Sequence, residues 1–463
     1  MFPREIYIGR RSKLREKMNH GIALFLGNYE TPMNYRSNTY RFRQDSNFLY
    51  FFGLDHPGLA GVIDFDKGTD TIYGNDIDIE DVIWMGPQPS VKEQAEVVGV
   101  TNTHPISELQ VTINSAIKKG RKVHFLPPYR HENMMVLNDL LGIGYGNLSK
   151  YISSDLIRSV VALRSIKDDY EIAEIEKACN VGYLMHTAAM HMCKAGVYER
   201  EIAGAIEGIV LASGGDISFP VILSQRGEVL HNHDHGSMLE SGRLMITDAG
   251  AETAMHYCSD FTRVAPVGGV FSQKQKEIYN IVLAANNHAA KMAKPGVKYQ
   301  DVHLSVAKVI ASNLIDLGLM KGDVDEAVKN GAHALFLPHG LGHMMGLDVH
   351  DMEDLGENFV GYDDETSRID QFGTAYLRLG RRLQPGFVFT NEPGIYFIPA
   401  LIEKWKSEQI NASFINFNKL EQYYDFGGIR LEDDLLITEN GCRLLGDKRI
   451  PITVEEVEAA VKQ

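Results

Sequence analysis

The sequence predicts an α/β protein with two domains, the second of which is built from two similar halves. The chain has 463 residues, more than one ordinary domain contains, so two domains are expected. The pattern of strand-like and helix-like segments changes near residue 160. A segment that begins at Met192 is then echoed by one that begins at Met292.

The first domain is predicted to cover residues 1–160 and to be α/β, because short β-rich runs alternate with helical stretches. The strand-like runs are residues 21–27, 47–54, 61–66 and 121–127. Asp168 can cap a helix with apolar residues at helical spacing, including Ile172 and Ile175. The second domain is therefore expected to occupy residues 161–463.

The internal echo lies in this second domain. MCKAGVYEREIAGAI and MAKPGVKYQDVHLSV agree in kind at most positions, and in each copy a helix ends near a glycine, Gly196 or Gly296. Chance similarity between two amphipathic helices is the alternative. Strand-rich segments follow both copies, which slightly favours a duplication, and a duplicated fold places a site where its halves face each other.

Composition and charge exclude several classes of function. The net charge of −15 repels phosphate backbones and anionic membranes, so neither nucleic acid nor a membrane is an expected partner. No window approaches the roughly 18 continuous apolar residues that span a bilayer, and no signal peptide is expected. The four cysteines show no CxxC pairing, which is typical of a reducing compartment. A cytoplasmic protein is expected.

Two carboxylates end apolar strand faces in the first half. Under strand alternation Asp248 shares a face with Leu244 and Ile246, and Asp260 shares a face with Thr262. The two aspartates are twelve residues apart, across a predicted hairpin. A buried carboxylate needs a cation or a proton, whereas a single strand aspartate is more often a solvated edge residue. The pair makes these two interpretations about equally good.

The second half adds further candidates: His339, His343, His350, Glu392, Arg430 and Glu432. A lone histidine is more often structural, a glutamate beside Pro-Gly is more often a turn residue, and HxxxH spacing alone is a weak zinc signal. Together, however, four carboxylates with histidine and no cysteine suit a pair of Mn²⁺-like ions. Bridging carboxylates can hold two such ions roughly 3.5–4 Å apart for hydrolysis.

At these motifs the sequence resembles the peptidases that include prolidase, aminopeptidase P and methionine aminopeptidase, which share the duplicated pita-bread fold. The motifs that carry the resemblance are DAG, SDFTR, HGLGH, EPG and IRLEDD. The resemblance implies that Asp248 ligates one ion, that His343 and Glu392 bind the second, and that Asp260 and Glu432 bridge both. The spacing of the two aspartates is one residue longer than is usual in the family, so an extra residue is expected in the turn, around 252–255.

The resemblance extends along most of the chain. YRFRQDSNFLYFFGLDHPG is similar to the N-terminal domain shared by prolidase and aminopeptidase P, and the stretch from YLRLGRR to FGGIRLEDD is more similar to prolidase. Arg378 matches the arginine that prolidases keep for the free carboxylate of a dipeptide. A surface arginine is a nearly equal alternative, because Arg381 and Arg382 are adjacent.

The resemblance also implies roles around the metals. Glu392 is expected to act as general base, and His350 or His339 to donate hydrogen bonds to the substrate carbonyl. His231 would line the substrate pocket, while its neighbours His233 and His235 have weaker claims. For Arg430, orienting Glu432 and a plain salt bridge predict the same geometry. In related oligomers the residue matching Trp84 reaches a neighbouring subunit's site, but a core position is expected here.

The predicted function is an Xaa-Pro dipeptidase that uses two divalent ions, with Mn²⁺ favoured over Co²⁺ or Zn²⁺. The nearest rival is an Xaa-Pro aminopeptidase that acts on longer peptides. A non-catalytic pita-bread binding module and a creatine-type amidinohydrolase are weaker hypotheses, because the metal ligands of the family are retained. The expected partners are short proline-containing peptides and a second copy of the chain, as a homodimer.

Overall fold

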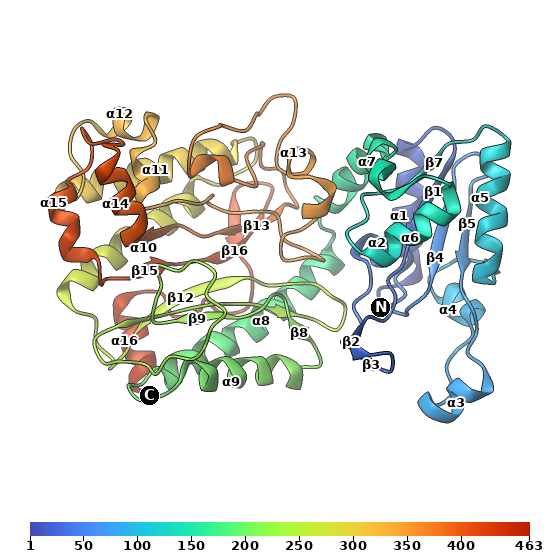
Figure 1. Cartoon of the computed structure of the whole chain (residues 1–463), viewed down its shortest axis with the longest axis horizontal. Helices are drawn as coiled ribbons and strands as arrows, with labels where there is room; N and C mark the ends of the chain where they lie inside the picture. The colour runs from blue at the N-terminus through green and yellow to red at the C-terminus, as the bar shows by residue number, and fades with distance from the viewer. The chain divides into compact units, whose positions relative to one another are not determined.

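The computed structural model describes all residues, 1–463, and divides into two compact units. The first unit comprises Met1–Arg164 with Glu353–Phe359, and the second comprises Ser165–Met352 with Val360–Gln463. Each unit contains both helices and strands, so the predicted α/β class is confirmed (Figure 1).

The first unit is built on a mixed five-stranded sheet in the order β6-β5-β4-β1-β7. β1 pairs antiparallel with β4 and parallel with β7, and β5 pairs parallel with β6. The five strands are β1 (Ile22–Leu26), β4 (Ala60–Asp64), β5 (Thr69–Tyr73), β6 (Asn102–His104) and β7 (Val123–His124). A separate two-stranded sheet is formed by β2 (Pro32–Tyr35) and β3 (Asn38–Thr39). The helices are α1 (Arg4–Lys17), α2 (Ser46–Phe52), α3 (Ile79–Met85), α4 (Val91–Val97), α5 (Leu109–Lys118), α6 (His131–Leu141) and α7 (Ser154–Arg164).

One predicted strand of this unit is wrong. The apolar run at 47–54 forms most of helix α2, not a strand. The Asp45 side chain accepts a hydrogen bond from the Phe48 N–H and so caps the helix, and Gly53 ends it in a left-handed conformation. A short apolar run buried on all sides shows no period, and the two caps decide its structure.

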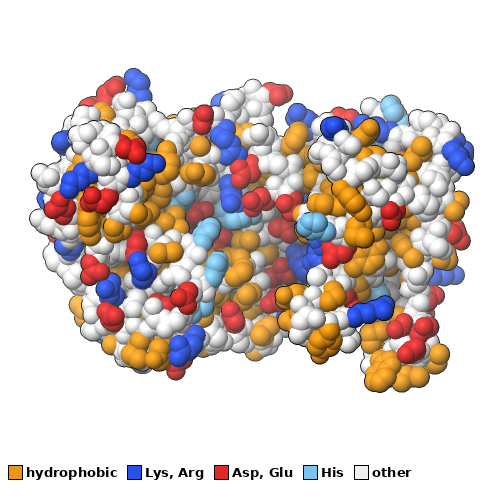
Figure 2. Space-filling model, in the orientation of Figure 1, with side chains coloured by type: hydrophobic (Ala, Val, Ile, Leu, Met, Phe, Trp, Pro, Cys, Tyr) orange, Lys and Arg blue, Asp and Glu red, His pale blue; other side chains and the backbone are white.

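The exposed helix α3 corrects a second expectation. Trp84 is 79% exposed rather than part of the core, and Ile79 and Ile83 are 75% and 72% exposed. Figure 2 shows apolar side chains at the tip where Figure 1 places α3. A helix with no buried residue keeps an apolar surface that the rest of this chain does not cover.

The second unit is formed by two similar halves. The first half contains α8 (Asp169–Met192), α9 (Glu199–Ala212), β8 (Asp216–Ile217), β9 (Ile222–Ser224), β10 (Leu244–Ala249), β11 (Ala251–Glu252) and β12 (Phe261–Pro266). The second contains α10 (Gln273–Met292), α11 (Tyr299–Asp316), α12 (Val324–Lys329), β13 (Val388–Asn391), β14 (Gly394–Tyr396), α14 (Pro399–Ser407), α15 (Phe417–Leu420), β15 (Gly428–Arg430), β16 (Asp433–Ile437), β17 (Cys442–Leu444) and α16 (Val454–Lys462). The short helix α13 (Glu357–Val360) begins in the segment that belongs to the first unit. α8 packs on β10 and β12, and α10 packs on β13 and β15 (Figure 1).

The duplication is visible in the backbone at an offset of 100 residues. The Gly196 N–H bonds to the Leu239 carbonyl and the Gly296 N–H bonds to the Leu383 carbonyl, at the same distance of 2.9 Å. Both glycines have positive φ values, +90° and +85°. On α9 and α11, the equivalent residues Ile202 and Val302 are both fully buried, and so are Ile206 and Val306. The predicted duplicated second domain is thus confirmed.

Two smaller observations complete the fold. All four cysteines are free, and three of them are buried. The chain has no helix that combines the length and the apolar character needed to cross a bilayer.

Candidate metal centre

The hairpin formed by β10 and β12 positions the first two carboxylates. β10 pairs antiparallel with β12, Asp248 opposite Thr262, in a register that runs without a shift from Leu244 to Ala249. Because side chains alternate along each strand, Asp248 and Asp260 lie on the same face of the hairpin. Both residues are buried, 7% and 5% exposed.

The turn of this hairpin accommodates the long spacing between the two aspartates. The pairing continues to a bond between the Thr253 N–H and the Tyr257 carbonyl, which leaves three residues at the tip. His256 at the tip has a φ of +66°, as three-residue hairpin loops require. The register supports an extra residue in the turn and not in a strand, so Asp260 keeps its face.

The third predicted ligand lies on a loop that is bonded to β13. The His343 N–H donates to the Thr390 hydroxyl at 3.1 Å, and the Thr390 N–H donates to the His343 carbonyl at 3.0 Å. A Cβ on Gly342 would lie 2.0 Å from the Thr390 carbonyl oxygen, so only glycine allows this approach. The loop therefore brings His343 next to Glu392, which directly follows β13.

Glu432 comes from the connection between β15 and β16. Its N–H donates to the Thr262 carbonyl at 3.1 Å, and its carboxylate accepts from the Thr262 hydroxyl at 2.6 Å. The residue is 1% exposed. Thr262 thus fixes Glu432 against the strand that begins next to Asp260.

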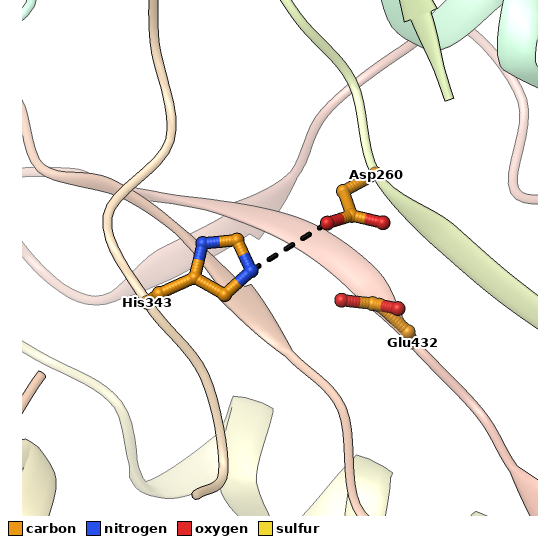
Figure 3. Close-up of side chains that lie close together, drawn as sticks. All are labelled: Asp260, His343 and Glu432. Atoms are coloured by element: carbon orange, nitrogen blue, oxygen red, sulfur yellow. Dashed lines mark ion pairs between the residues drawn. The ribbon is translucent and has the colours of Figure 1, made fainter. Parts of the chain in front are cut away.

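Three of the five predicted ligands converge closely. One ligand atom from each of Asp260, His343 and Glu432 lies within 4.8 Å of the others, and Figure 3 shows these side chains pointing toward one another. His343 Nε2 lies 3.5 Å from an Asp260 oxygen and 3.8 Å from a Glu392 oxygen. The His343 Nδ1–H donates to the Met344 carbonyl, so in the neutral imidazole the lone pair of Nε2 can face a cation.

The electrostatics of this cluster favour a bound cation. Burial raises the pKa values of Asp260 and Glu432 well above the usual range, and the neighbouring carboxylates raise them further. Burial also raises the pKa of Glu392. One oxygen each of Asp248 and Asp260 is buried without a hydrogen-bond partner. Oxygen-rich, mutually repelling carboxylates beside an imidazole fit hard or borderline divalent cations.

Asp248 is connected to the cluster by a buried arginine. Arg430 donates to Asp248 at 2.5 Å, to the Thr262 hydroxyl at 3.0 Å and to the Tyr396 hydroxyl at 2.7 Å. Thr262 in turn bonds Glu432, so Arg430 connects Asp248 to Glu432. The sequence patterns did not single out Tyr396, although Glu392, Gly394 and Tyr396 have the period of a strand face.

His339 lies beside Glu392, and both of its ring nitrogens face protein partners. Its Nδ1 lies 2.7 Å from the Gly340 carbonyl and its Nε2 lies 2.9 Å from the Tyr396 hydroxyl. Burial, and then the charge of Arg430, lower the pKa of His339 to about 3, so its imidazole is neutral. Both ring nitrogens of His339 are thus engaged by the protein itself.

His350 and Arg378 meet at the edge of the cluster. The His350 ring stands at 75° to the His343 ring with centroids 4.3 Å apart, and its Nδ1 contacts the Arg378 guanidinium. Arg378 is only partly exposed, whereas Arg382 pairs at the surface with Glu365 at 2.8 Å. Of the neighbouring arginines, Arg378 is therefore the one directed at the site.

The segment that contains His231 lies near the same site. Burial, and then Arg430, lower the pKa of His231. The other two histidines of the segment bond to backbone carbonyls, His233 to Val221 at 3.3 Å and His235 to Leu223 at 3.0 Å. Figure 2 shows histidine and acidic side chains gathered where this face of the second unit is hollowed.

Comparison with known proteins identifies the family. A model described as "Metallopeptidase family M24" matches residues 173–439, and one described as "Aminopeptidase P, N-terminal domain" matches residues 7–124. The chain belongs to metallopeptidase family M24. It is thus a metal-dependent hydrolase with divalent ions as cofactors, and its second unit has the pita-bread fold of this family.

Relatives and solved structures of this family cover nearly the whole chain. The human Xaa-Pro dipeptidase is 30% identical over 99% of this chain and 94% of its own length. A Fusarium vanettenii protein named a probable Xaa-Pro aminopeptidase is 33% identical over 91% of this chain and 87% of its own. An Escherichia coli aminopeptidase P variant in complex with substrate superposes with a TM-score of 0.80 at 28% identity, covering 100% of this chain and 98% of the other.

Proposed function

We propose that this chain is an Xaa-Pro dipeptidase that uses two divalent ions to hydrolyse the peptide bond before proline. The proposal is supported by relatives of about 30% identity named as Xaa-Pro peptidases and by the convergence of Asp260, His343 and Glu432. Residues 1–160 would form the N-terminal domain of this enzyme and residues 161–463 its catalytic domain.

Five residues would hold the ions: Asp248, Asp260, His343, Glu392 and Glu432. Three of them already lie within 4.8 Å of one another, and four carboxylates balance the charge of two divalent ions. When bound, such ions activate water and polarise a carbonyl. Mn²⁺ is proposed because the set is rich in oxygen ligands, and Co²⁺ or Zn²⁺ could occupy the same ligands.

The side chains around the ions would handle the proton and the substrate. Glu392 is the proposed general base: its side chain is 18% exposed, against 10% for Asp248 and 7% for Asp260, so it can exchange a proton with the substrate side. Arg378 would donate a hydrogen bond to His350 Nδ1, which leaves the His350 Nε2–H to donate to the substrate carbonyl. His231 would line the pocket for the residue before proline.

Arg378 supports the dipeptidase over the aminopeptidase. A guanidinium at the edge of the cluster can pair in a bidentate manner with the C-terminal carboxylate of the proline in a dipeptide. A longer peptide has no carboxylate at that position. Arg378 would therefore select substrate length.

Cleavage of Ala-Pro and Ala-Pro-Ala tests this proposal. Faster cleavage of the tripeptide would favour the Xaa-Pro aminopeptidase, to which several relatives correspond by name. Arg378→Ala should lower kcat/KM for Ala-Pro by about 10- to 100-fold, the loss of one charge-assisted contact, and affect Ala-Pro-Ala much less. Arg382→Ala is the matched control, because Arg382 pairs with Glu365 at the surface.

We also propose that the enzyme is a cytoplasmic homodimer. The apolar, exposed face of α3, which includes Trp84, supports a contact with a second copy. The four free cysteines support a reducing compartment. Sedimentation of the parent chain and of Ile83→Asp/Trp84→Asp tests the dimer: the parent should sediment as two copies and the variant as one.

A further inference from the structure

Two buried polar side chains occupy equivalent positions in the two halves of the second unit. His186 lies on α8 and Asn286 lies on α10, at the same offset of 100 residues that relates the rest of the duplication. They are 1% and 0% exposed. Neither residue belongs to the motifs that predict the metal centre, and each faces the strands that carry the proposed ligands of its own half.

His186 contacts the residues beside both carboxylates of the first half. Its Nε2 donates to the Ala249 carbonyl at 3.0 Å, and Ala249 directly follows Asp248. The ring also packs edge-on against Phe261, with centroids 6.1 Å apart, and Phe261 directly follows Asp260. Burial lowers the pKa of His186 to about 4, so the imidazole is a neutral donor.

Asn286 makes the corresponding contacts in the second half. Its Nδ2 donates to the Asn391 carbonyl at 3.2 Å and to the Leu431 carbonyl at 3.0 Å. These two residues directly precede Glu392 and Glu432. The Asn391 side chain donates back to the Asn286 carbonyl at 3.0 Å, so helix and strand are bonded in both directions.

We propose that His186 and Asn286 are matching positioning residues that set the separation of the ligand-carrying strand ends in each half, and thereby the affinity for divalent metal. This inference rests on the proposed function. In the second half, the carbonyls held by Asn286 fix the Cα atoms of the residues that follow them, Glu392 and Glu432. In the first half, the bond to Ala249 and the packing on Phe261 hold the residues that directly follow Asp248 and Asp260. A metal site tolerates only small displacements of its ligands. Loss of such outer contacts typically costs about 10- to 100-fold in metal affinity.

A purely structural role is the competing explanation, because any buried polar side chain needs partners. The two explanations differ in what they predict. A structural role lowers the stability of the chain and leaves the Mn²⁺ dissociation constant unchanged. A positioning role raises the dissociation constant even where the metal-free chain stays folded.

Calorimetric titration of the EDTA-stripped full chain with MnCl₂ separates them. His186→Leu and Asn286→Leu should each weaken Mn²⁺ binding by about 10- to 100-fold, and His186→Gln, which keeps an amide donor near the position of Nε2, should restore part of the affinity. Thr187→Ala and His288→Ala are matched controls: Thr187 bonds only within α8, and His288 bonds to Ser305 on α11. Both controls should bind Mn²⁺ as the parent does.

The outcomes are distinct. Leucine variants that bind Mn²⁺ as tightly as the parent, with a lowered Tm, would overturn the positioning role and leave the proposed function intact. A parent chain that takes up no divalent ion would overturn both. If a leucine variant fails to fold, His186→Ser or Asn286→Ser replaces it, with the same expected loss of affinity.

Discussion

Without metal, the buried carboxylates of the cluster repel one another, and Asp260→Asn should reduce this repulsion. Asp260 is 5% exposed, and burial together with Asp248, Asp434 and Glu392 raises its pKa well above the usual range. Two charges 4.8 Å apart, the outer limit for the ligand atoms of Asp260 and Glu432, repel by about 3 kcal/mol at an effective dielectric constant of about 20. Without metal, and at a pH at which both groups are ionised, the substitution should stabilise the fold by about this amount.

The sign reverses when metal is added. At about 100 times its dissociation constant, one bound ion stabilises the folded parent by about 2.7 kcal/mol. Asp260→Asn loses a proposed bridging ligand, so it should gain much less from Mn²⁺. The variant should therefore be the more stable chain in EDTA and the less stable chain in MnCl₂.

The pH dependence follows from the raised pKa values of Asp260 and Glu432. A carboxyl group whose pKa is higher in the folded than in the unfolded state stabilises the fold fully below its ordinary pKa, about 4. That stability is lost as the pH rises through the folded-state pKa. The metal-free parent should thus lose stability from about pH 4 upward, and Asp260→Asn should lose less.

Urea unfolding at about pH 5 and about pH 8, in EDTA and in MnCl₂, measures these differences. Asp433→Asn is the matched control: Asp433 is also buried, but Arg263 and Arg449 overcome the effect of burial and lower its pKa. This control should destabilise the chain in both buffers. An Asp260→Asn chain less stable than the parent in EDTA at the higher pH, or equally stabilised by Mn²⁺, would refute the reasoning.

Two further substitutions test the frame around the site. Lys167 pairs with Asp351 at 2.9 Å, and both side chains are 1% exposed. Lys167→Met leaves the buried Asp351 charge uncompensated and should lower the free energy of unfolding in urea by about 3–5 kcal/mol. Adding Asp351→Leu to the same chain should restore most of that loss. Tyr396→Phe leaves Arg430 and His339 without a shared partner. It should lower the free energy of unfolding by about 1–3 kcal/mol, and an unchanged value would show that water replaces the hydroxyl.

Much of the site follows from local sequence rules. Strand alternation predicted a shared face for Asp248 with Leu244 and Ile246, and the hairpin register agrees with it. Asp168 was predicted to cap a helix and does so, with its side chain accepting from the Glu171 N–H. These features depend on the period of one strand or on the first turn of one helix, and such periods can be read without knowing the fold.

Other predictions failed or stayed open because neighbours outside the segment decide them. The apolar run at 47–54 became α2 through its caps, and Trp84 lies on a helix that this chain leaves uncovered. The sequence could not choose between Arg378 and its neighbouring arginines. Only the fold places Arg378 against His350, which is 28 residues away along the chain.

The sequence by itself determined which residues could bind metal, their order along the chain and the faces on which they lie. Only the tertiary structure decided how they are held: Arg430 bonds Asp248 across 182 residues, and Asn286 bonds Leu431 across 145. The reason is physical. Side-chain direction repeats with the local backbone, whereas the partner of a buried donor depends on which distant segments pack against it.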